Sequence, residues 1–430
     1  VIGGGIMGCS TLYHLAKMGV SDAILLERNK LTSGTTWHSA AQVRALRHSH
    51  NLTKMIQYST DLYAQLEQET AQNVGWIQKG SLSIATTPDR AVHVRRQEAL
   101  AHAFGVRAKW IEADEAKERW PLMNSDDVLG AVWSPDDGRV SPSDVCAALV
   151  KGAKARGAKI FEGTGVTGIL TKNGRITGVE TNRGTVKCDA IALCTGLWSR
   201  ELAATAGADV PALACEHFYL LTKPIDGITG NMPTLSDHDN HLYIRDDSGG
   251  LLVGCFEPLG KPIAPGVLDE NFAFGLLPED WDHFEPMMEL ALNRIQITDG
   301  IALEDFRGSF SGQGGFSGNF QGRVNGGPLV KGTVVPRDGR SAMRLLSDDA
   351  GGLANAAGLL QNASGGTLDL TLLPVAGEGM FDGILSVRGL RIRDAPAMAA
   401  LLDAISVVGL LQQLDGQGLS FDEVDARFRL

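Results

Sequence analysis

The chain opens on Val1-Ile2-Gly3-Gly4-Gly5-Ile6-Met7-Gly8, and this stretch decides the fold of its first part. Its G-x-G-x-x-G spacing assigns a task to each glycine: Gly3 permits a tight turn, Gly5 lets the backbone approach a pyrophosphate, and Gly8 lets a helix pack close to its strand. The helix N-terminus then offers free N–H groups and a positive dipole end to the phosphates. We therefore predict a dinucleotide-binding turn whose cofactor contacts are Gly3, Gly5, Ile6, Met7 and Gly8.

The residues that follow favour a complete nucleotide-binding unit, whereas a lone glycine motif would be weak evidence. Tyr13 to Ala16 continues a helix, Gly19 ends it, and Ala23 to Leu26 is an apolar run typical of the next strand. Glu27 closes that strand about twenty residues after the glycines, where a ribose hydroxyl needs an acceptor. We include Glu27 and its neighbour Arg28 in the predicted cofactor site.

A second stretch, Leu31 to Ala40 (LTSGTTWHSA), indicates which dinucleotide is bound. It resembles the flavin-attachment loop of the dimethylglycine and sarcosine dehydrogenase family, in which a histidine is bonded covalently to the 8α-methyl group of FAD. The resemblance extends to about residue 295 and assigns the attachment to His38. It implies that the link makes the flavin a stronger oxidant, which favours amine oxidation. The contacts with FAD that it implies in this loop are Gly34, Thr35, Thr36, Trp37, His38 and Ser39.

The same resemblance implies two later contacts with FAD. Val166 corresponds to a residue that packs beside the adenine through its backbone. The apolar run that starts at Asp189 ends in a turn at Gly196, which the family uses against FAD. Trp198 follows this turn, and for its side chain both simple core packing and a role at the flavin stay open.

Substrate residues are assigned on two stretches, 216–222 and 241–245, that predict neighbouring strands roofing the flavin. In related amine-oxidising flavoenzymes a histidine and a tyrosine at matching places line the substrate pocket. The resemblance thus implies catalytic roles for His217 and Tyr243. Arg245 is a candidate for a bidentate contact with a substrate carboxylate. A half-exposed strand with ordinary alternation is the other interpretation of these residues.

The expected reaction needs no strong nucleophile, since FAD accepts a hydride from the N-methyl carbon of a small amine substrate. The amine must be neutral, so a polar but dry pocket with a titratable histidine suits the reaction. Two alternatives stay open. One is a D-amino-acid or glycine oxidase with non-covalent FAD, against which the pair Trp37-His38 argues. The other is a non-catalytic envelope-biogenesis or lipid-handling fragment joined to an inactive flavin domain. The electron acceptor cannot be identified from the sequence.

Composition limits the remaining possibilities. A chain of 430 residues can form two or three domains with large cores. A net charge of −11 argues against binding nucleic acid or an anionic membrane surface. No stretch is long and apolar enough to span a bilayer. The six cysteines lack CxxC or metal-ligand spacing, so we expect free thiols in a reducing, cytoplasmic location and no metal site.

The composition changes abruptly near residue 297. All tryptophans, tyrosines, histidines and cysteines lie before Phe284, and none recurs after it. We therefore predict two regions: an α/β FAD-binding domain of the D-amino-acid-oxidase type with an antiparallel-sheet substrate domain over 1–297, and a separate mainly β region over 298–430. In the stretches 299–308, 347–352 and 390–398, the second region resembles the C-terminal β-rich part of AsmA-like envelope proteins. Its expected elements are strands at 318–324, 333–339 and 367–373 and a helix at 395–411.

Both ends of the flavin region are expected to be incomplete. The chain starts at the glycine motif without an initiator methionine or a signal peptide, so we expect an N-terminally truncated fragment. In the resembled family, a closing strand and helix follow the residues that match Leu290 to Arg294. The sequence changes character at that point. We therefore expect this closing segment to be absent, and both flavin affinity and activity to suffer.

Overall fold

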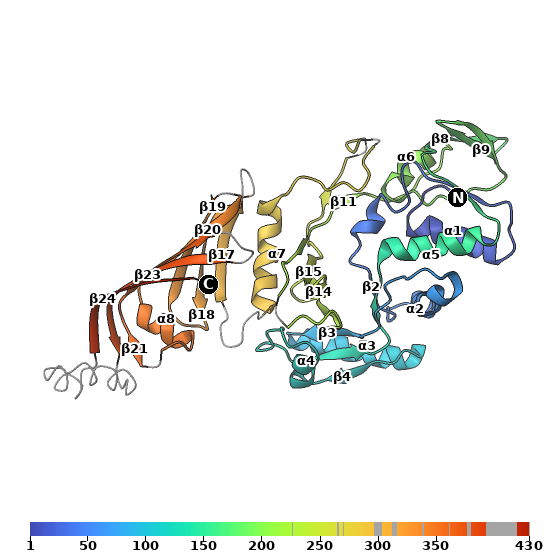
Figure 1. Ribbon diagram of the computed structural model, residues 1–430. Coiled ribbons are helices and arrows are strands. Elements are labelled where there is room, and N and C mark those ends of the chain that lie inside the picture. The colour runs from blue at the N-terminus through green and yellow to red at the C-terminus, as the bar shows by residue number, and fades with distance from the viewer. Residues whose placement is uncertain are drawn as a thin grey trace. The chain divides into compact units, whose positions relative to one another are not determined.

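The computed structural model describes residues 1–430 except 226, 265, 270, 296–302, 312–315, 338, 361, 376–379, 393–418 and 430. The chain forms two compact units (Figure 1). Unit 1 comprises Val1–Trp120 and Asp127–Leu277, and unit 2 comprises Pro121–Asp126 and Pro278–Leu430. The domain boundary that we predict after residue 297 stays a prediction.

The nucleotide-binding part of unit 1 forms around the first residues of the chain. The strand β1 (Ile24–Leu26) pairs in parallel with β7 (Lys159–Phe161). Ile2 forms parallel bridges to Leu26 on one side and to Leu193 on the other. The predicted apolar strand before Gly196 is thus present as a short pairing with Ile2, while its other residues are irregular.

Two helices pack on each other beside this sheet (Figure 1): α1 (Ile6–Lys17) and α5 (Pro142–Lys154). Leu12 on α1 and Leu149 on α5 are almost completely buried, and burial of such a side chain stabilises the fold by about 1.5–3 kcal/mol. The predicted end of the first helix at Gly19 agrees with the structure, in which Gly19 adopts a φ of +90°.

A mixed sheet of seven strands forms the other part of unit 1, in the order β12-β15-β14-β13-β3-β5-β4. Its strands are β3 (Ser81–Ala85), β4 (Lys109–Ile111), β5 (Gly130–Ser134), β12 (Tyr219–Leu221), β13 (Thr234–Asp237), β14 (Leu242–Asp247) and β15 (Gly250–Cys255). The sequence predicts an antiparallel sheet, and every pairing is antiparallel except β13 with β3, which is parallel. Parallel pairing arises there because a long crossover separates these strands in the chain.

One row of residues crosses this sheet and later defines a site. Val132, Ser83, Ser236, Tyr243 and Gly254 are paired in register, each with the next. Residues directly opposite each other in neighbouring strands project from the same face of a sheet. The row therefore presents two small hydroxyls next to a phenol on one face.

Smaller elements complete unit 1. Its other helices are α2 (His50–Thr70), α3 (Pro88–Phe104), α4 (Ala113–Arg119), α6 (Ser199–Ala204) and the short 3₁₀ turns η1 (Thr35–His38) and η2 (Gly196–Trp198). Its other strands are β2 (Gln42–Val43), β6 (Gly138–Arg139), β8 (Val166–Lys172), β9 (Arg175–Thr181), β10 (Gly184–Lys187), β11 (Cys215–Glu216) and β16 (Lys261–Pro262). All six cysteines are free thiols.

In its described residues, unit 2 contains an antiparallel sheet of eight strands and two helices. Its elements are α7 (Trp281–Arg294), β17 (Leu303–Ser311), β18 (Ser317–Val324), β19 (Leu329–Arg337), β20 (Arg340–Ser347), α8 (Ala350–Ala356), β21 (Ala363–Ser364), β22 (Thr367–Pro374), β23 (Phe381–Ile392) and β24 (Leu419–Arg429). The strands expected at 318–324, 333–339 and 367–373 correspond to β18, β19 and β22. The helix expected at 395–411 lies outside the described residues.

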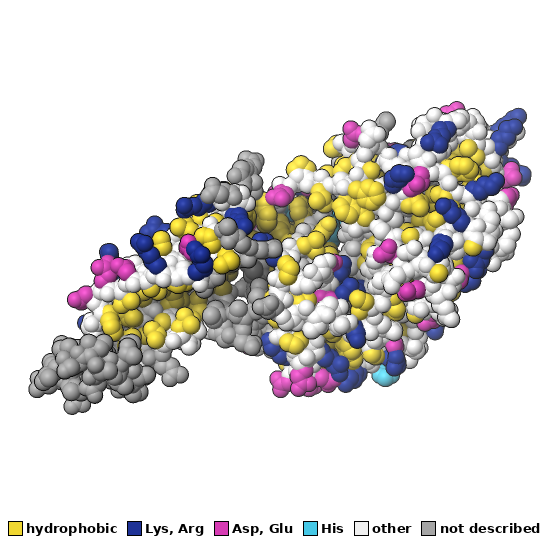
Figure 2. Space-filling model, viewed as in Figure 1, with side chains coloured by type: hydrophobic (Ala, Val, Ile, Leu, Met, Phe, Trp, Pro, Cys, Tyr) yellow, Lys and Arg dark blue, Asp and Glu magenta, His cyan; other side chains and the backbone are white. Residues whose placement is uncertain are grey.

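The strands of unit 2 pair among themselves wherever the structure describes them. Burial alternates along β19, as expected for a sheet with one covered face. Figure 2 shows hydrophobic side chains at the surface of this unit, and Val335, Leu346 and Ile384 are among the exposed ones. Over the described residues, no helix of either unit has the length and apolar character needed to cross a membrane.

Candidate active site

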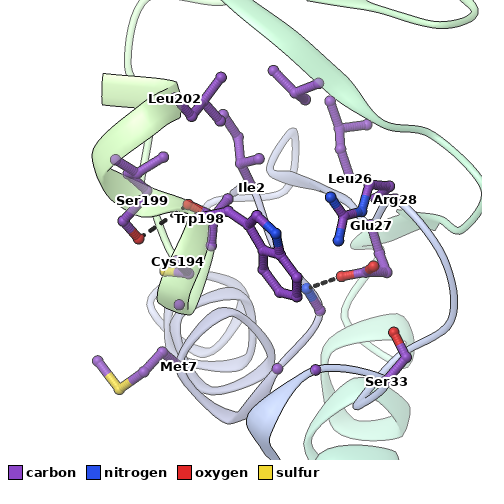
Figure 3. Close-up of a pocket in the computed structure, with 18 of the residues that line it drawn as sticks. Ile2, Met7, Leu26, Glu27, Arg28, Ser33, Cys194, Trp198, Ser199 and Leu202 are labelled. Carbon is purple, nitrogen blue, oxygen red and sulfur yellow. Dashed lines mark hydrogen bonds between the residues drawn. The ribbon is translucent and has the colours of Figure 1, made fainter. Parts of the chain in front are cut away.

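A cavity of about 770 Å³ lies where the N-terminus of α1, the end of β1 and the turn η2 meet (Figure 3). Its lining residues come from the glycine motif, from β1 and the segment after it, from 164–167 and from 193–205. The predicted cofactor residues that line it are Gly3, Gly5, Ile6, Met7, Glu27, Arg28, Gly34, Thr35, Thr36, Val166, Gly196 and Trp198. Gly8, Trp37, His38 and Ser39 do not line it.

The glycines of the motif lie where a side chain has no room. Gly3 has a φ of +104°, and a Cβ there would lie 2.3 Å from the carbonyl oxygen of Cys194. A Cβ on Gly8 would lie 1.8 Å from the carbonyl oxygen of Gly3. The helix therefore starts directly against the turn, so that its N-terminus lies at the cavity, and a helix N-terminus favours an anion.

The carboxylate of Glu27 binds two backbone N–H groups at this cavity. The backbone N–H of Gly4 donates to Oε2 at 2.6 Å, and that of Asn29 donates to Oε1 at 2.7 Å. Each carboxylate oxygen can accept a further hydrogen bond. Glu27 thus holds the glycine turn and retains the capacity for the ribose contact that the sequence predicts.

Thr36 connects the glycine turn to the segment that carries His38. The backbone N–H of Ile6 donates to Thr36 Oγ1 at 3.0 Å. The N-cap of α1 is Gly5, which has no side chain to satisfy this donor. The loop of residues 31–41, the His38 loop, therefore caps α1, a contact that no local sequence signal could reveal.

The indole of Trp198 lines the cavity and lies beside Arg28 (Figure 3). The guanidinium of Arg28 lies 4.3 Å from the centroid of the Trp198 ring, within the range of a cation–π interaction. A Cβ on Gly34 would lie 3.4 Å from the same ring. Trp198 thus forms part of the cavity wall and is not a core side chain.

His38 ends the turn η1 beside two aromatic rings. Its ring centroid lies 4.0 Å from that of Trp37, which lies 5.8 Å from Phe274. Burial lowers the pKa of His38, so its imidazole is neutral at physiological pH. Among the residues that the structure describes, the buried indole N–H of Trp37 has no hydrogen-bond partner. The loop thus places the neutral imidazole of His38 next to Trp37, whose indole N–H has no partner among the described residues.

His217 and Tyr243, predicted from separate stretches, lie together. His217 Nε2 and the Tyr243 hydroxyl are 3.0 Å apart. The other ring nitrogen, Nδ1, lies 2.8 Å from Glu257 Oε2, and Glu257 Oε1 accepts the backbone N–H of Phe218 at 2.8 Å. Sequence reasoning missed Glu257, although an acidic residue just after a buried strand is a signal that could have raised it.

The position of the Tyr243 ring depends on Gly254. The two residues are paired across β14 and β15, and a Cβ on Gly254 would lie 2.0 Å from the Tyr243 ring. The ring therefore leans over Gly254. Burial is the main cause that raises the pKa of Tyr243, so its hydroxyl stays protonated and can donate to His217.

A second cavity, of about 360 Å³, lies on the same sheet and was not predicted. The Arg44 guanidinium donates to the hydroxyls of Ser83 and Ser236, two members of the row that contains Tyr243. Phe256 lines this cavity and its ring lies 5.1 Å from that of Tyr243. Arg44 therefore supplies positive charge beside the His217–Tyr243 pair.

His238 lines the second cavity as well. Burial, followed by the charges of Arg44 and Arg90, lowers its pKa to about 4. Its ring lies 6.3 Å from the Phe256 ring. His238 is thus a neutral polar side chain at neutral pH.

Arg245, the predicted carboxylate ligand, has partners within the protein. Its Nε donates to the Ala40 carbonyl at 2.7 Å, and another nitrogen donates to the Asp246 carbonyl at 2.9 Å. A third contact is the ion pair with Asp247 at 2.7 Å. Only 7% of Arg245 is exposed, and its role in substrate binding stays a prediction.

Comparison with known proteins places these features among flavoenzymes. The family model "FAD dependent oxidoreductase" matches residues 1–382, which extends past residue 297. Mouse mitochondrial sarcosine dehydrogenase is 39% identical over 310 residues, covering 71% of this chain and 33% of that protein. The formaldehyde-forming 4-methylaminobutanoate oxidase of Paenarthrobacter nicotinovorans is 41% identical over 287 residues, covering 67% of this chain and 35% of that protein. Rat mitochondrial dimethylglycine dehydrogenase is 33% identical over 306 residues, covering 69% and 36%. The chain thus spans about a third of the length of these relatives.

Solved structures confirm the predicted fold of the first region. L-proline dehydrogenase from P. horikoshii superposes with a TM-score of 0.60 at 26% identity, covering 68% of this chain and 75% of that chain. Glycine oxidase from Bacillus cereus has a TM-score of 0.55 at 22% identity, covering 68% of this chain and 78% of that chain, and shows the fold alone. The AsmA-like resemblance of residues 298–430 stays a prediction.

Proposed function

Because the chain belongs to the family of FAD-dependent oxidoreductases, we propose that it oxidises small N-methylated amino acids of the sarcosine and dimethylglycine type. The observation that carries the proposal is the row on the seven-stranded sheet. It brings the Tyr243 hydroxyl, hydrogen-bonded to His217, next to the arginine-bearing cavity of Arg44. A proton acceptor beside a positive charge suits an amino acid, which carries an amine and a carboxylate.

The residues of unit 1 suit FAD. The glycine turn leaves no space for a Cβ, which is the form of a pyrophosphate cradle. The Glu27 carboxylate has capacity for a ribose hydroxyl, and the Trp37 indole N–H, unpaired among the described residues, is a donor for a bound group. When bound, FAD accepts a hydride from the N-methyl carbon of the substrate.

We propose covalent attachment of FAD through His38. His38 would hold the flavin through a bond to its 8α carbon, because burial keeps the imidazole neutral and leaves a ring-nitrogen lone pair available. The support for the linkage is therefore the loop of this chain itself, with its neutral imidazole.

The His217–Tyr243 pair would prepare the substrate amine. The Tyr243 oxygen accepts a proton from the substrate ammonium while the phenolic proton moves to His217 Nε2, which leaves a neutral amine and an imidazolium. The Glu257 carboxylate, 2.8 Å from Nδ1, stabilises that imidazolium. Arg44 would meet the substrate carboxylate, since charge-assisted pairing of guanidinium and carboxylate is strong.

Two experiments test the proposal. Acid precipitation should leave yellow, fluorescent wild-type protein, whereas His38→Ala should release its flavin into the supernatant. A colourless wild-type pellet from yellow protein would contradict the covalent link.

Anaerobic mixing with sarcosine or dimethylglycine should bleach the flavin absorbance. Equal bleaching by D-alanine would favour the oxidase alternative. Folded wild-type protein that takes up no FAD would instead favour the non-catalytic alternative.

A further inference from the structure

The His38 loop (residues 31–41) is anchored to β14, the strand that carries Tyr243. The guanidinium of Arg245 on β14 donates from Nε to the carbonyl of Ala40, two residues after His38, at 2.7 Å. The other two guanidinium nitrogens of Arg245 contact the Asp247 carboxylate and the carbonyl of Asp246. The side chain is 8% exposed, so water competes little for the bond to Ala40.

Arg245 and Tyr243 project from the same face of the sheet, because they are two residues apart on β14. The loop that bears His38 is therefore tied to the face from which the Tyr243 hydroxyl projects. The contact between Arg245 and Ala40 sets how far the loop lies from the catalytic pair. A flavin attached to this loop depends on that spacing for its distance to a substrate at Tyr243.

Two further contacts act in the same place. Gln42 Nε2 donates to the carbonyl of Ile244 at 3.4 Å. Arg139 forms an ion pair with the buried Asp246 at 2.7 Å, and its backbone pairs with Gln42 where β2 meets β6. Ile244 and Arg245 of β14 thus contact Gln42 and Ala40 directly, and Asp246 reaches the same segment through Arg139.

The loop needs such an anchor because its end is strained. Ala41 has a φ of +52°, in the left-handed region that an alanine adopts only at a cost of about 1–2 kcal/mol. Thr32, at the start of the loop, has a φ of +66°. Strained residues of this kind persist where surrounding contacts hold them. Arg245 holds the carbonyl immediately before Ala41.

We propose that Arg245 is a positioning residue that fixes the His38 loop over the Tyr243 face of the sheet and thereby permits flavin attachment. The attachment half of this statement rests on the proposed function, since it takes His38 as the linked residue. The loop-fixing half does not depend on flavin. The nucleotide cavity includes no atom of Arg245, so binding of the nucleotide end of FAD is separate from this role.

The test compares Arg245→Met and Arg245→Lys with Arg90→Met as the matched control. Arg90 lies on α3 and forms an ion pair at 2.9 Å with Asp239, which follows β13, and its partners among the described residues lie outside the loop. Hydrogen exchange is measured by mass spectrometry on peptides spanning 39–43 and, as an internal reference, 24–30. Covalent flavin is measured in acid pellets and divided by total flavin in the untreated protein.

Arg245→Met should exchange about tenfold faster in the 39–43 peptide, because a charge-assisted hydrogen bond is lost, with the reference peptide unchanged. Its covalent fraction should fall by about the same factor while total flavin stays near the wild-type level. Arg245→Lys should recover part of both values, since an ammonium can still donate to the Ala40 carbonyl. Arg90→Met should change neither.

If the 39–43 peptide of Arg245→Met exchanges hydrogen at the wild-type rate, the proposal is overturned, whether or not the protein carries flavin. Equal loss of covalent and total flavin, accompanied by the same fall in thermal midpoint as in Arg90→Met, would overturn it as well, because that pattern indicates a structural role only. Wild-type protein without covalent flavin would overturn the attachment at His38, and hydrogen exchange would still decide whether Arg245 fixes the loop.

Discussion

The nucleotide cavity and the Tyr243 face of the sheet belong to the same unit but are built by different means. At the cavity, backbone approaches backbone, and a Cβ on Gly8 would lie 1.8 Å from a carbonyl oxygen. At the sheet face, side chains from separate strands meet, as in the chain from Glu257 through His217 to Tyr243. Flavin binding at the cavity should therefore be lost when an atom is added. Proton transfer at the sheet face should be lost when an atom is removed.

The strongest test of this contrast adds a single methyl group to the cavity. Gly8→Ala forces the start of α1 away from the turn, because the new Cβ has no space beside the Gly3 carbonyl. We expect flavin content after purification to fall more than about a hundredfold, since overpacking of a rigid site shifts backbone. Absorbance of the purified protein measures the loss.

Gly19→Ala is the control for Gly8→Ala. Gly19 also has a positive φ, of +90°, but a Cβ added there would have no atom within 4 Å. This substitution should lower stability by about 1 kcal/mol and leave flavin content intact. A flavin content of Gly8→Ala equal to that of the wild type would contradict this difference between the cavity and the sheet face.

The second test removes one oxygen from the sheet face. Tyr243→Phe keeps the ring over Gly254 but deletes the hydroxyl that lies 3.0 Å from His217 Nε2. We expect the rate of anaerobic flavin reduction by sarcosine to fall about 10²–10³-fold, as is usual when a proton-transfer group is lost. Covalent flavin content should not change.

Glu257→Gln refines the second test, since it keeps a hydrogen-bonding side chain beside His217 but removes its charge. The amide stabilises an imidazolium less, so the substrate ammonium gives up its proton less readily at a given pH. The rate of anaerobic flavin reduction by sarcosine should therefore fall. A reduction rate equal to that of the wild type would show that Glu257 does not act through His217.

The third test lowers the pH, which should reduce the stability of the protein through protonation of His238 beside the sheet face. His238 has a pKa of about 4 in the folded protein, mainly because it is buried, against about 6.5 in the unfolded chain. The unfolded state binds the proton more readily, so stability is complete above pH 6.5 and declines as the pH falls towards 4. The contribution is at most about 3 kcal/mol, and less to the extent that water reaches the ring.

Thermal midpoints of the wild type and His238→Gln between pH 7 and pH 4 measure this contribution. The variant should lose less stability over that interval. Parallel curves for the two proteins would show that protonation of His238 does not limit folding.

The smallest expected effect concerns a side chain at the cavity. Trp198→Leu removes the ring that lies 4.3 Å from the Arg28 guanidinium. An exposed cation–π contact contributes about 0.5–1 kcal/mol, so FAD affinity should weaken by only a few-fold. Titration of apoprotein with FAD measures it, and a loss as large as that in Gly8→Ala would remove the distinction between backbone and side-chain contributions at this cavity.

The same contrast explains how much the sequence could predict. The cavity follows from glycine spacing and from Glu27 at the end of a short strand, because its parts are close in the chain. Val166 and Trp198 came from the family resemblance, and both line the cavity. His38 came from the same resemblance, and its link to FAD stays a proposal.

The sheet face was less accessible to prediction. His217 and Tyr243 were named from a resemblance, but their hydrogen bond requires pairings among strands that are distant in sequence. Arg44 joins them only because β3 pairs with β13, and no local pattern specifies that pairing. For Arg245, charge suggested a ligand contact, whereas its partners lie within the protein. The local sequence pattern could not distinguish an arginine that binds a substrate carboxylate from one that bonds to groups within the protein.

The bridges of Ile2 to Leu26 and Leu193 also determine when the cavity can form. During synthesis on the ribosome, the glycine turn emerges before the segment at residue 193, which supplies one of its flanking pairings. Closing so long a loop is slow, and the contact cannot exist before that segment has emerged. The parallel pairing of β3 with β13 delays the sheet face further, to residue 237 and beyond. Residues 1–8 must therefore wait for nearly two hundred further residues to be made before they can hold a nucleotide.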